Sequence, residues 1–489
     1  MKVKNTIVTS SKAFLLLVAL SALTSWMRLH AQHSSIRFSS SDSALQTAFY
    51  RAKEMALSYQ GRSTDPVGPW YEAALPERSA FCIRDVSHQC IPAEMLGMHR
   101  ENRNMFTHFL LNISESKDWC TFWEMNKSGG PAPEDYRNDT AFWYNLNANF
   151  ELVHACWRLY NWTGDSSYIT HPVAKRFFQL TMHQYISRWI LQVDSLLKRP
   201  PFPNAPQPFN FNDYFHRCRG LPSYYESLSD MQMGVDLVAA IYRSMISFAG
   251  IAKVWGDAAT AKSFLQKAER YRRQLEANWW DESKQRYNTW YNNKGVFGRS
   301  EGDVFLLWYD ALTDSSRIRG TLEAMEHSNW NVENLSYTPL QLCKYGNWKK
   351  AYDNILYLTN PGTQRREYPE VSFGVLEGIV QGLMGLSADA TMNQVRSLNN
   401  FRSAHFSEIR DLKILGITIR LKHWSKGASF TNEGRKPLRW RAAFHGNLPW
   451  IMAGGRKIKA AHETDNMGNS ITYVDLQVGP GKKITATIP

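Results

Sequence analysis

Acidic and aromatic residues occur together in six segments of this 489-residue chain. The first, WYEAALPERSAFCIRDVSHQ at 70–89, is too charged for a core strand and too aromatic for a solvated linker. Trp and Tyr rings stack on the C–H faces of sugar rings, while carboxylates and guanidinium groups bind hydroxyls. Cleavage of a glycosidic bond needs two further carboxyl groups with opposed protonation. These residue types therefore indicate chemistry on a carbohydrate.

The five later segments carry the same kind of side chain. They are DWCTFWEMNKSGGPAPEDYRND from 118, NDYFHRCRGLPSYYESLSD from 212, YNTWYNNKGVFGRSEGD from 287, NWNVENLSY from 329 and QRREYPEVSFG from 364. Any single acidic residue among them is more simply a helix cap or a solvated charge. Glu301, Asp303 and Asp230 each suit a helix N-terminus, where the helix dipole favours negative charge. A functional interpretation therefore depends on the segments meeting in space.

Apolar periodicity predicts twelve helices. They lie near 42–60, 85–97, 100–114, 141–162, 166–197, 231–254, 257–280, 302–312, 315–327, 336–345, 348–359 and 372–387. Every second connection is short and built from turn or capping residues, such as Thr163-Gly164-Asp165 and Gly256-Asp257. The other connections are long, and they contain the six acidic and aromatic segments. Alternating long and short connections place all the long ones on one face.

Six such helix pairs predict a mainly α fold, an (α/α)6 toroid with the long loops around one mouth. From about 401, short alternating runs separated by Gly, Asn and Pro turns predict a small antiparallel, β-sandwich-like module. The predicted domains are thus a toroid at 32–400 and a β-module at 401–489. Residues 1–31 read as a signal peptide, with lysines followed by a short apolar run ending at Ala31. The mature protein is expected to be exported, to the periplasm or beyond, without a stable membrane span.

The net charge and the cysteine spacing indicate which partners and cofactors to expect. The net charge is +13; removing the signal, with its four basic residues and no acidic one, leaves +9. This excess favours an acidic partner such as a uronic-acid glycan. Basic stripes typical of nucleic-acid binding are lacking, so no nucleic-acid partner is expected. The six cysteines show no zinc spacing, and no cofactor or metal is predicted; they read mostly as buried apolar residues. Oligomeric state stays open.

The chain resembles the six-hairpin glycosidase superfamily. The resemblance rests on an ordered set of landmarks: WYEAALPERSAFCIRDVSHQ, DWCTFWEMNK, RGLPSYYESLSDMQMGVD, EGDVFLLWYDAL, NVENLSY and REYPEVSFGVLEGIVQGLMG. It covers nearly the whole chain after the signal. The set is similar to exported bacterial members, and to uronic-acid-acting families such as the family 154 β-glucuronidases. The resemblance implies a glycoside hydrolase that inverts configuration.

The resemblance also implies roles for individual residues. Glu226 is the implied general acid, with Asp230 as its competitor, and Glu370 is the implied general base, with Glu367 as its competitor. We expect the base to stay ionised near Arg365 or Arg366. The substrate-binding candidates all lie in or beside the long loops: Glu72, Arg78, Arg84, Asp85, His88, Gln89, Trp123, Glu124, Arg219, Tyr224, Tyr225, Glu301, Glu333 and Arg366.

Two other classes stay open. A polysaccharide lyase or sugar isomerase on the same toroid could use Tyr224, His216 and Arg219 as base and charge neutraliser. A non-catalytic glycan-binding protein would use the aromatic residues alone, although it would not need so many carboxyl groups.

Overall fold

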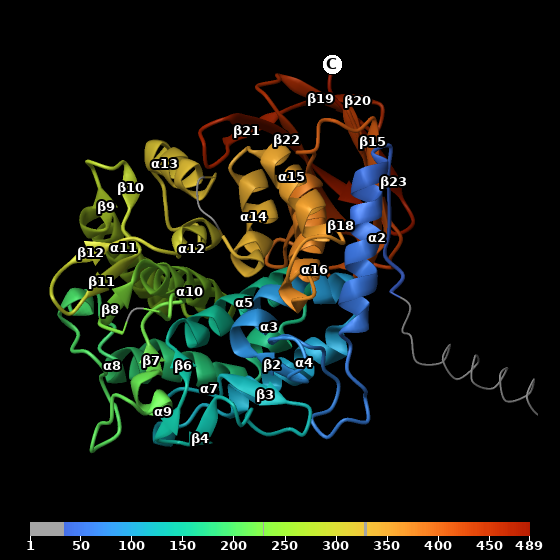
Figure 1. Ribbon diagram of the computed structural model, residues 1–489. Coiled ribbons are helices and arrows are strands. Elements are labelled where there is room, and N and C mark those ends of the chain that lie inside the picture. Colours follow the sequence, from blue (N-terminus) through green and yellow to red (C-terminus); the bar gives the residue numbers. More distant parts are fainter. Residues whose placement is uncertain (1–33, 228, 327–329) are drawn as a thin grey trace, which may run out of the picture. The chain divides into compact units, whose positions relative to one another are not determined.

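The computed structural model describes residues 34–227, 229–326 and 330–489. The predicted signal peptide lies outside these residues. Residues Ile36–Pro489 form one compact unit, to which everything below refers. Its first part is helical and its last part is built of strands (Figure 1).

The predicted helices are confirmed, mostly to within a few residues at their ends. They are α2 (Ser43–Ser58), α3 (Ile83–Met95), α4 (His99–Leu111), α5 (Asn147–Thr163), α7 (Pro172–Leu180), α10 (Val235–Val254), α11 (Ala258–Asn278), α12 (Asp303–Trp308), α13 (Ser315–Glu326), α14 (Val332–Lys344), α15 (Trp348–Thr359) and α16 (Pro369–Glu377). A π-helical turn, Gly378–Leu383, continues α16.

The helix predicted at 166–197 is divided. It consists of α6 (Ser167–Thr170), α7, a π-helical turn at Thr181–Tyr185 and α8 (Ile186–Arg188). Pro172 at the start of α7 explains the first break, because a proline disfavours helical backbone at the residue before it, and His171 has a ψ of 137°. A further short helix, α9 (Tyr214–Arg217), lies in the third long loop.

The short connections work as predicted. Gly164 follows α5 with φ of 73°, a left-handed conformation that glycine adopts without strain. The side chain of Asp257 accepts a hydrogen bond of 2.9 Å from the Thr260 N–H and so caps α11. These tight reversals send successive helices back antiparallel, so that the long loops gather at the opposite ends.

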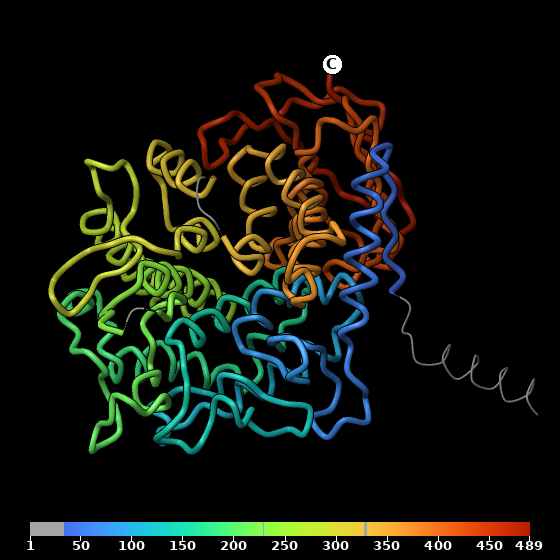
Figure 2. Tube along the Cα trace, viewed as in Figure 1, coloured from blue at the N-terminus to red at the C-terminus, as the bar shows by residue number. Residues whose placement is uncertain are grey.

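Six helices form an inner set, in which each contacts the next. Helix α3 packs on α5, α5 on α10, α10 on α12, α12 on α14, α14 on α16, and α16 on α3 again. The outer helix α2 packs against α15 and α16, joining the first part of the helical region to its last (Figures 1 and 2). Helix α10 is long and apolar enough to cross a membrane, but 78% of its most apolar window is buried inside the protein. Its apolar surface is explained by this central position.

Two sheets follow the helices. The seven-stranded sheet has the order β1 (Arg37–Ser40), β15 (Phe406–Ile414), β16 (Ile417–Trp424), β17 (Gly427–Asn432), β23 (Lys483–Thr487), β19 (Trp450–Ala453) and β20 (Arg456–Lys459). The five-stranded sheet has the order β13 (Ser387–Asp389), β14 (Gln394–Leu398), β18 (Leu438–His445), β22 (Ser470–Val478) and β21 (Ala461–Thr464). In β16, alternate residues are buried, as the sequence pattern predicts.

The pairings between strands within 401–489 are all antiparallel, as predicted, whereas β14, which precedes residue 401, pairs with β18 in parallel. The sheets also draw on segments outside 401–489. Strand β1 comes from the beginning of the unit and pairs with β15, while β13 and β14 precede residue 401. Such pairings join distant parts of the chain, and apolar alternation within one segment does not reveal its partner.

Candidate active site

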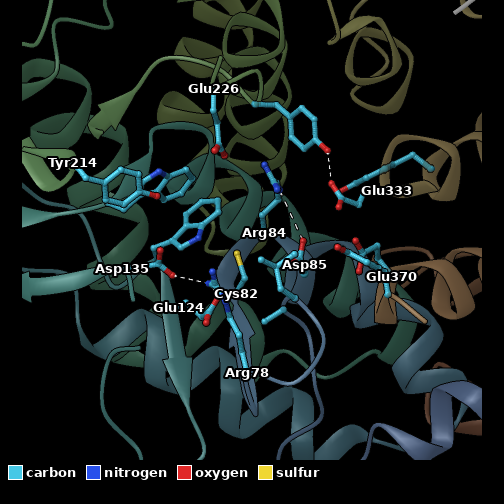
Figure 3. A pocket seen from close by; sticks show the side chains of 17 residues that line it. Arg78, Cys82, Arg84, Asp85, Glu124, Asp135, Tyr214, Glu226, Glu333 and Glu370 are labelled. Carbon is cyan, nitrogen blue, oxygen red and sulfur yellow. Dashed lines mark hydrogen bonds and ion pairs between the residues drawn. The ribbon is translucent and has the colours of Figure 1, made fainter. Parts of the chain in front are cut away.

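A pocket of about 240 Å³ opens where the long loops meet (Figure 3). Its walls come from the first, second, third, fifth and sixth long loops and the helix ends beside them. The lining carboxyl groups are Asp85, Glu124, Asp135, Glu226, Glu333 and Glu370, the aromatic residues are Trp123, Trp143, Tyr214, Tyr224, Tyr337 and Tyr368, and the basic residues are Arg78 and Arg84. The prediction that these segments meet is therefore confirmed for five of the six.

Short strands hold the first two loops together. Strand β2 (Ala80–Cys82) pairs with β3 (Glu124–Asn126), with Cys82 opposite Glu124. This register brings Arg78 beside Glu124: one guanidinium nitrogen of Arg78 lies 3.0 Å from Glu124 Oε2 and 3.2 Å from Asp135 Oδ2. The floor of the pocket thus has two carboxyl groups sharing one arginine.

Arg84 lies in the first turn of α3, and two aromatic rings contact its guanidinium group. Its guanidinium lies 4.3 Å from the ring centre of Tyr224 and 5.4 Å from that of Trp123, within cation–π range. Its Nε is 3.9 Å from Asp85 Oδ1. The Nη1 atom is buried and has no hydrogen-bond partner among the described residues. Arg84 therefore retains an unused donor at the pocket.

Glu333 lies in the first turn of α14. It accepts hydrogen bonds from the Tyr224 hydroxyl at 2.9 Å and from Arg365 at 2.7 Å. Arg365, which was expected beside Glu370, thus pairs with Glu333. In the view of Figure 3, Glu226 lies across the pocket from Glu333 and Glu370.

Glu370 lies in the first turn of α16 and is 6% exposed. Its Oε2 has no hydrogen-bond partner among the described residues. Burial, followed by the charges of Asp85 and Glu333, raises the pKa of Glu370 well above its usual range. The raised pKa favours a protonated Glu370 over the ionised base expected at this position.

Burial is also the largest cause of the raised pKa of the other carboxyl groups in the pocket. It raises the pKa of Asp85 to about 7, against the opposing charge of Arg84. It raises the pKa of Glu124 to about 7 and that of Asp135 to about 6, despite their shared Arg78. The pKa of Glu226 is raised for the same reason, with Arg84 opposing, even though this residue keeps contact with solvent. The pocket thus holds several carboxyl groups that can carry a proton near neutral pH.

Half of the sequence-predicted residues line this pocket. They are Arg78, Arg84, Asp85, Trp123, Glu124, Tyr224, Glu226, Glu333 and Glu370. The remaining nine are not part of its lining: Glu72, His88, Gln89, Arg219, Tyr225, Asp230, Glu301, Arg366 and Glu367.

Several of the nine have structural partners instead. His88 lies behind the pocket wall, its ring stacked on Tyr337 with 3.7 Å between ring centres. Asp230 accepts a hydrogen bond of 3.2 Å from Asn292. Glu301 accepts one of 3.0 Å from Asn334.

The rest of the nine are buried, partly buried or at the surface. Gln89 is fully buried, and Arg219 is buried and paired with Asp118. Glu72, Tyr225 and Arg366 are partly buried, and Glu367 is exposed.

Five polar or aromatic lining residues were not among the sequence candidates: Asp135, Trp143, Tyr214, Tyr337 and Tyr368. Four of them lie within the quoted segments, so the segments themselves were the available signal. Tyr337 is the informative case, because it comes one helical turn after Glu333 on α14 and so lies on the same face. That spacing could have identified it.

Metal binding finds no support in the described ranges, where no cluster of three or more His, Cys, Asp or Glu residues could hold an ion. All six cysteines are buried and unpaired. This confirms their interpretation as small apolar residues.

No family model matches the sequence, and no curated protein matches it. Solved structures do match. An α-L-rhamnosidase from Dictyoglumus thermophilum aligns with 93% of this chain and 51% of its own, at 13% identity and a TM-score of 0.58. The GH78 family rhamnosidase of Bacillus sp. GL1 aligns with 82% of this chain and 40% of its own, at 11% identity and 0.57. The chain shares its fold with these enzymes.

A metal-independent α-mannosidase from Streptococcus pneumoniae also matches. It aligns over 69% of this chain and 95% of its own, at 10% identity and a TM-score of 0.50. This chain spans about half the length of the two rhamnosidases, or less. At such identities the likeness concerns the fold alone, so the chemistry must be argued from the pocket.

Proposed function

We propose that this protein is a glycoside hydrolase that cleaves a glycosidic bond by acid–base chemistry between Glu226 and Glu370. The observation that carries the proposal is the pocket itself, where six carboxyl groups and six aromatic rings from five separate loops meet. Rings supply stacking surfaces for a sugar, and protonated and ionised carboxyl groups supply the two roles that hydrolysis requires. The volume of about 240 Å³ suits one sugar unit rather than a long chain.

The electrostatics favour Glu370 as the proton donor. It is nearly fully buried, and the neighbouring charges of Asp85 and Glu333 add to the effect of burial on its pKa. Glu226 is open to solvent and faces the charge of Arg84, so it is better placed to receive a proton from water. These roles are the reverse of those implied by the family resemblance.

The charge of the pocket favours a neutral sugar over a uronate. Six carboxyl groups face only two arginines, and Arg78 is already shared between Glu124 and Asp135. A substrate carboxylate would add negative charge to a site with little free positive charge. We therefore propose a neutral terminal sugar, bound by hydrogen bonds to Arg84 and to the carboxyl groups.

The three residues considered for a lyase do not come together in the pocket. Tyr224 lines the pocket, but Arg219 is committed to Asp118, and His216 lies beside Asp213. Burial raises the pKa of Tyr224 well above its usual range. The phenol therefore loses its proton less readily, and only the deprotonated form could act as the base. A hydrolase is the simpler proposal.

The contacts among the six inner helices support a toroidal arrangement. We infer that the contacts from α3 around to α16 and back to α3 form an (α/α)6 toroid, with the pocket at its loop-bearing mouth. The predicted signal segment supports export of the mature protein, to the periplasm or beyond. The domain boundary at residue 400 likewise stays a proposal.

The test uses aryl glycosides of neutral sugars with leaving groups of different acidity. Glu370→Gln should lower kcat by about 10²- to 10⁴-fold on poor leaving groups and much less on good ones, because a good leaving group needs no proton. Glu226→Gln should lower kcat on all of them. The matched controls are Glu367→Gln and Asp230→Asn, which lie off the pocket and should retain activity.

The outcomes separate the alternatives. Loss of activity in the two control variants but not in the pocket variants would contradict the proposed pair. An unsaturated product would identify a lyase. Binding of neutral sugars without any turnover would leave the pocket as a recognition site only.

A further inference from the structure

A second cavity, of about 440 Å³, lies at the other end of the inner helices. Helix α14 connects the two sites: Glu333 and Tyr337 line the first pocket, whereas Gln341 and Lys344 line the second cavity. The eleven residue-to-residue steps from Glu333 to Lys344 correspond to roughly 16 Å along a helix. The second cavity is therefore separate from the candidate active site.

The walls of the second cavity come from two parts of the fold. One side is made by inner helices, including Arg158 of α5 and Arg243 of α10. The other side is made by the five-stranded sheet and its loops, including Arg396 of β14 and Glu463 of β21. At 440 Å³ it falls within the usual range of small-molecule sites, about 300–1,000 Å³.

Between the two sites lies a packed layer. His88 stacks on Tyr337, and its ring meets Trp308 edge-on at 5.2 Å. The space left in this layer is about 10 Å³, room for no more than one water molecule. A sugar entering one site cannot pass to the other.

The charged groups around the second cavity are already paired. Arg243 and Lys344 both bind Asp310, and Arg396 binds Glu463. Arg158 binds Glu377 behind the wall. Because the charges compensate one another, the cavity has no strong demand for an ionic ligand.

Several polar atoms at the second cavity have no hydrogen-bond partner among the described residues. Gln341 is 0% exposed and lines the cavity, yet neither its Oε1 nor its Nε2 has a hydrogen-bond partner among the described residues. Gln381 Oε1, Arg243 Nε and Arg396 Nε, all from lining residues, are likewise buried without a partner. Leaving a buried polar group unpaired is unfavourable, so these atoms favour a ligand that can pair with them.

We infer that this cavity binds a neutral, polyhydroxylated molecule, up to a disaccharide in size. Gln341 requires one acceptor and one donor at neighbouring positions, and a sugar hydroxyl is both. Trp308 also lines the cavity. The inference does not depend on the proposed hydrolysis, because no residue of the candidate active site takes part.

The test is calorimetric titration of the full chain with D-glucose, L-rhamnose and maltose, and with D-glucuronate and inorganic phosphate as charged comparisons. Gln341→Leu should weaken binding of a neutral sugar by at least tenfold at one class of sites. Arg84→Ala, which alters the first pocket, should leave that class unchanged. Gln341→Leu should also retain hydrolytic activity, if the protein is a hydrolase.

Folding is checked through thermal stability. Replacing an unpaired buried amide with an apolar side chain of similar size should not lower Tm. Gln381→Leu serves as a second variant at the same cavity. Equal binding by wild type and both variants, binding of the anions alone, or no binding of any neutral sugar would overturn the inference. A protein that binds sugar through Gln341 but hydrolyses nothing would uphold it and contradict the proposed function.

Discussion

Glu124→Gln should change how stability depends on pH. Glu124 is 3% exposed, and burial raises its pKa from 4.5 to about 7. The contribution of protonated Glu124 to the free energy of unfolding is fully present below pH 4.5 and is lost as the pH rises through 7. Each unit is about 1.4 kcal/mol, so the whole shift corresponds to about 3 kcal/mol. Gln resembles the protonated form and does not suffer this loss.

The expected result is a difference between variant and wild type that grows with pH. Between pH 5 and pH 8, the free energy of unfolding of Glu124→Gln, relative to wild type, should rise by roughly 2.5 kcal/mol. Urea denaturation at the two pH values measures it. Glu115→Gln, at an exposed position, is the matched control and should show the same difference at both. Parallel pH curves for Glu124→Gln and wild type would refute the idea that burial dominates at this carboxyl group.

Three further outcomes are expected. Arg365→Ala should cost less than about 1 kcal/mol of stability, because the pair with Glu333 is partly exposed, but should lower kcat/KM by about tenfold or more; a variant with full activity would separate this pair from the chemistry. Gly374→Ala should lower both Tm and activity, despite its better helix propensity, since a Cβ there collides with the Ser336 carbonyl; an increase in Tm would contradict that packing. A reducing agent should leave Tm unchanged, and six thiols should react only after denaturation, as counted with a thiol reagent, because all the cysteines are buried and unpaired.

The parts of the fold that depend on local pattern were predictable. Apolar periodicity located the helices, and Gly164 and Asp257 marked two of the reversals. The alternation of long and short connections was enough to expect that the acidic and aromatic segments would meet. The family resemblance singled out Glu226 and Glu370 within these segments, and both residues line the pocket.

The electrostatic roles could not be predicted in this way. Arg365 is close in sequence to Glu370 but pairs with Glu333, because the packing of α14 against α16 brings these residues together. The raised pKa of Glu370 depends on burial and on Asp85, which is distant in sequence. Strand pairings such as β2 with β3 were likewise invisible, because each strand is only three residues long.

Glycines on α16 and its continuation let this helix pack close to α14, and both helices contribute residues to the pocket. Gly374, Gly378 and Gly382 recur every four residues from α16 into the π-helical turn, and so follow one face. A Cβ on Gly374 or Gly378 would overlap α14 at Ser336 or Pro339, and one on Gly382 would crowd that helix. The absence of side chains therefore lets α16 approach α14 closely. Glu370 begins one of these helices and Glu333 the other, so their charges interact because the two backbones are close. The charge of Glu333 adds to the effects of burial and of Asp85, which are the larger causes of the raised pKa of Glu370.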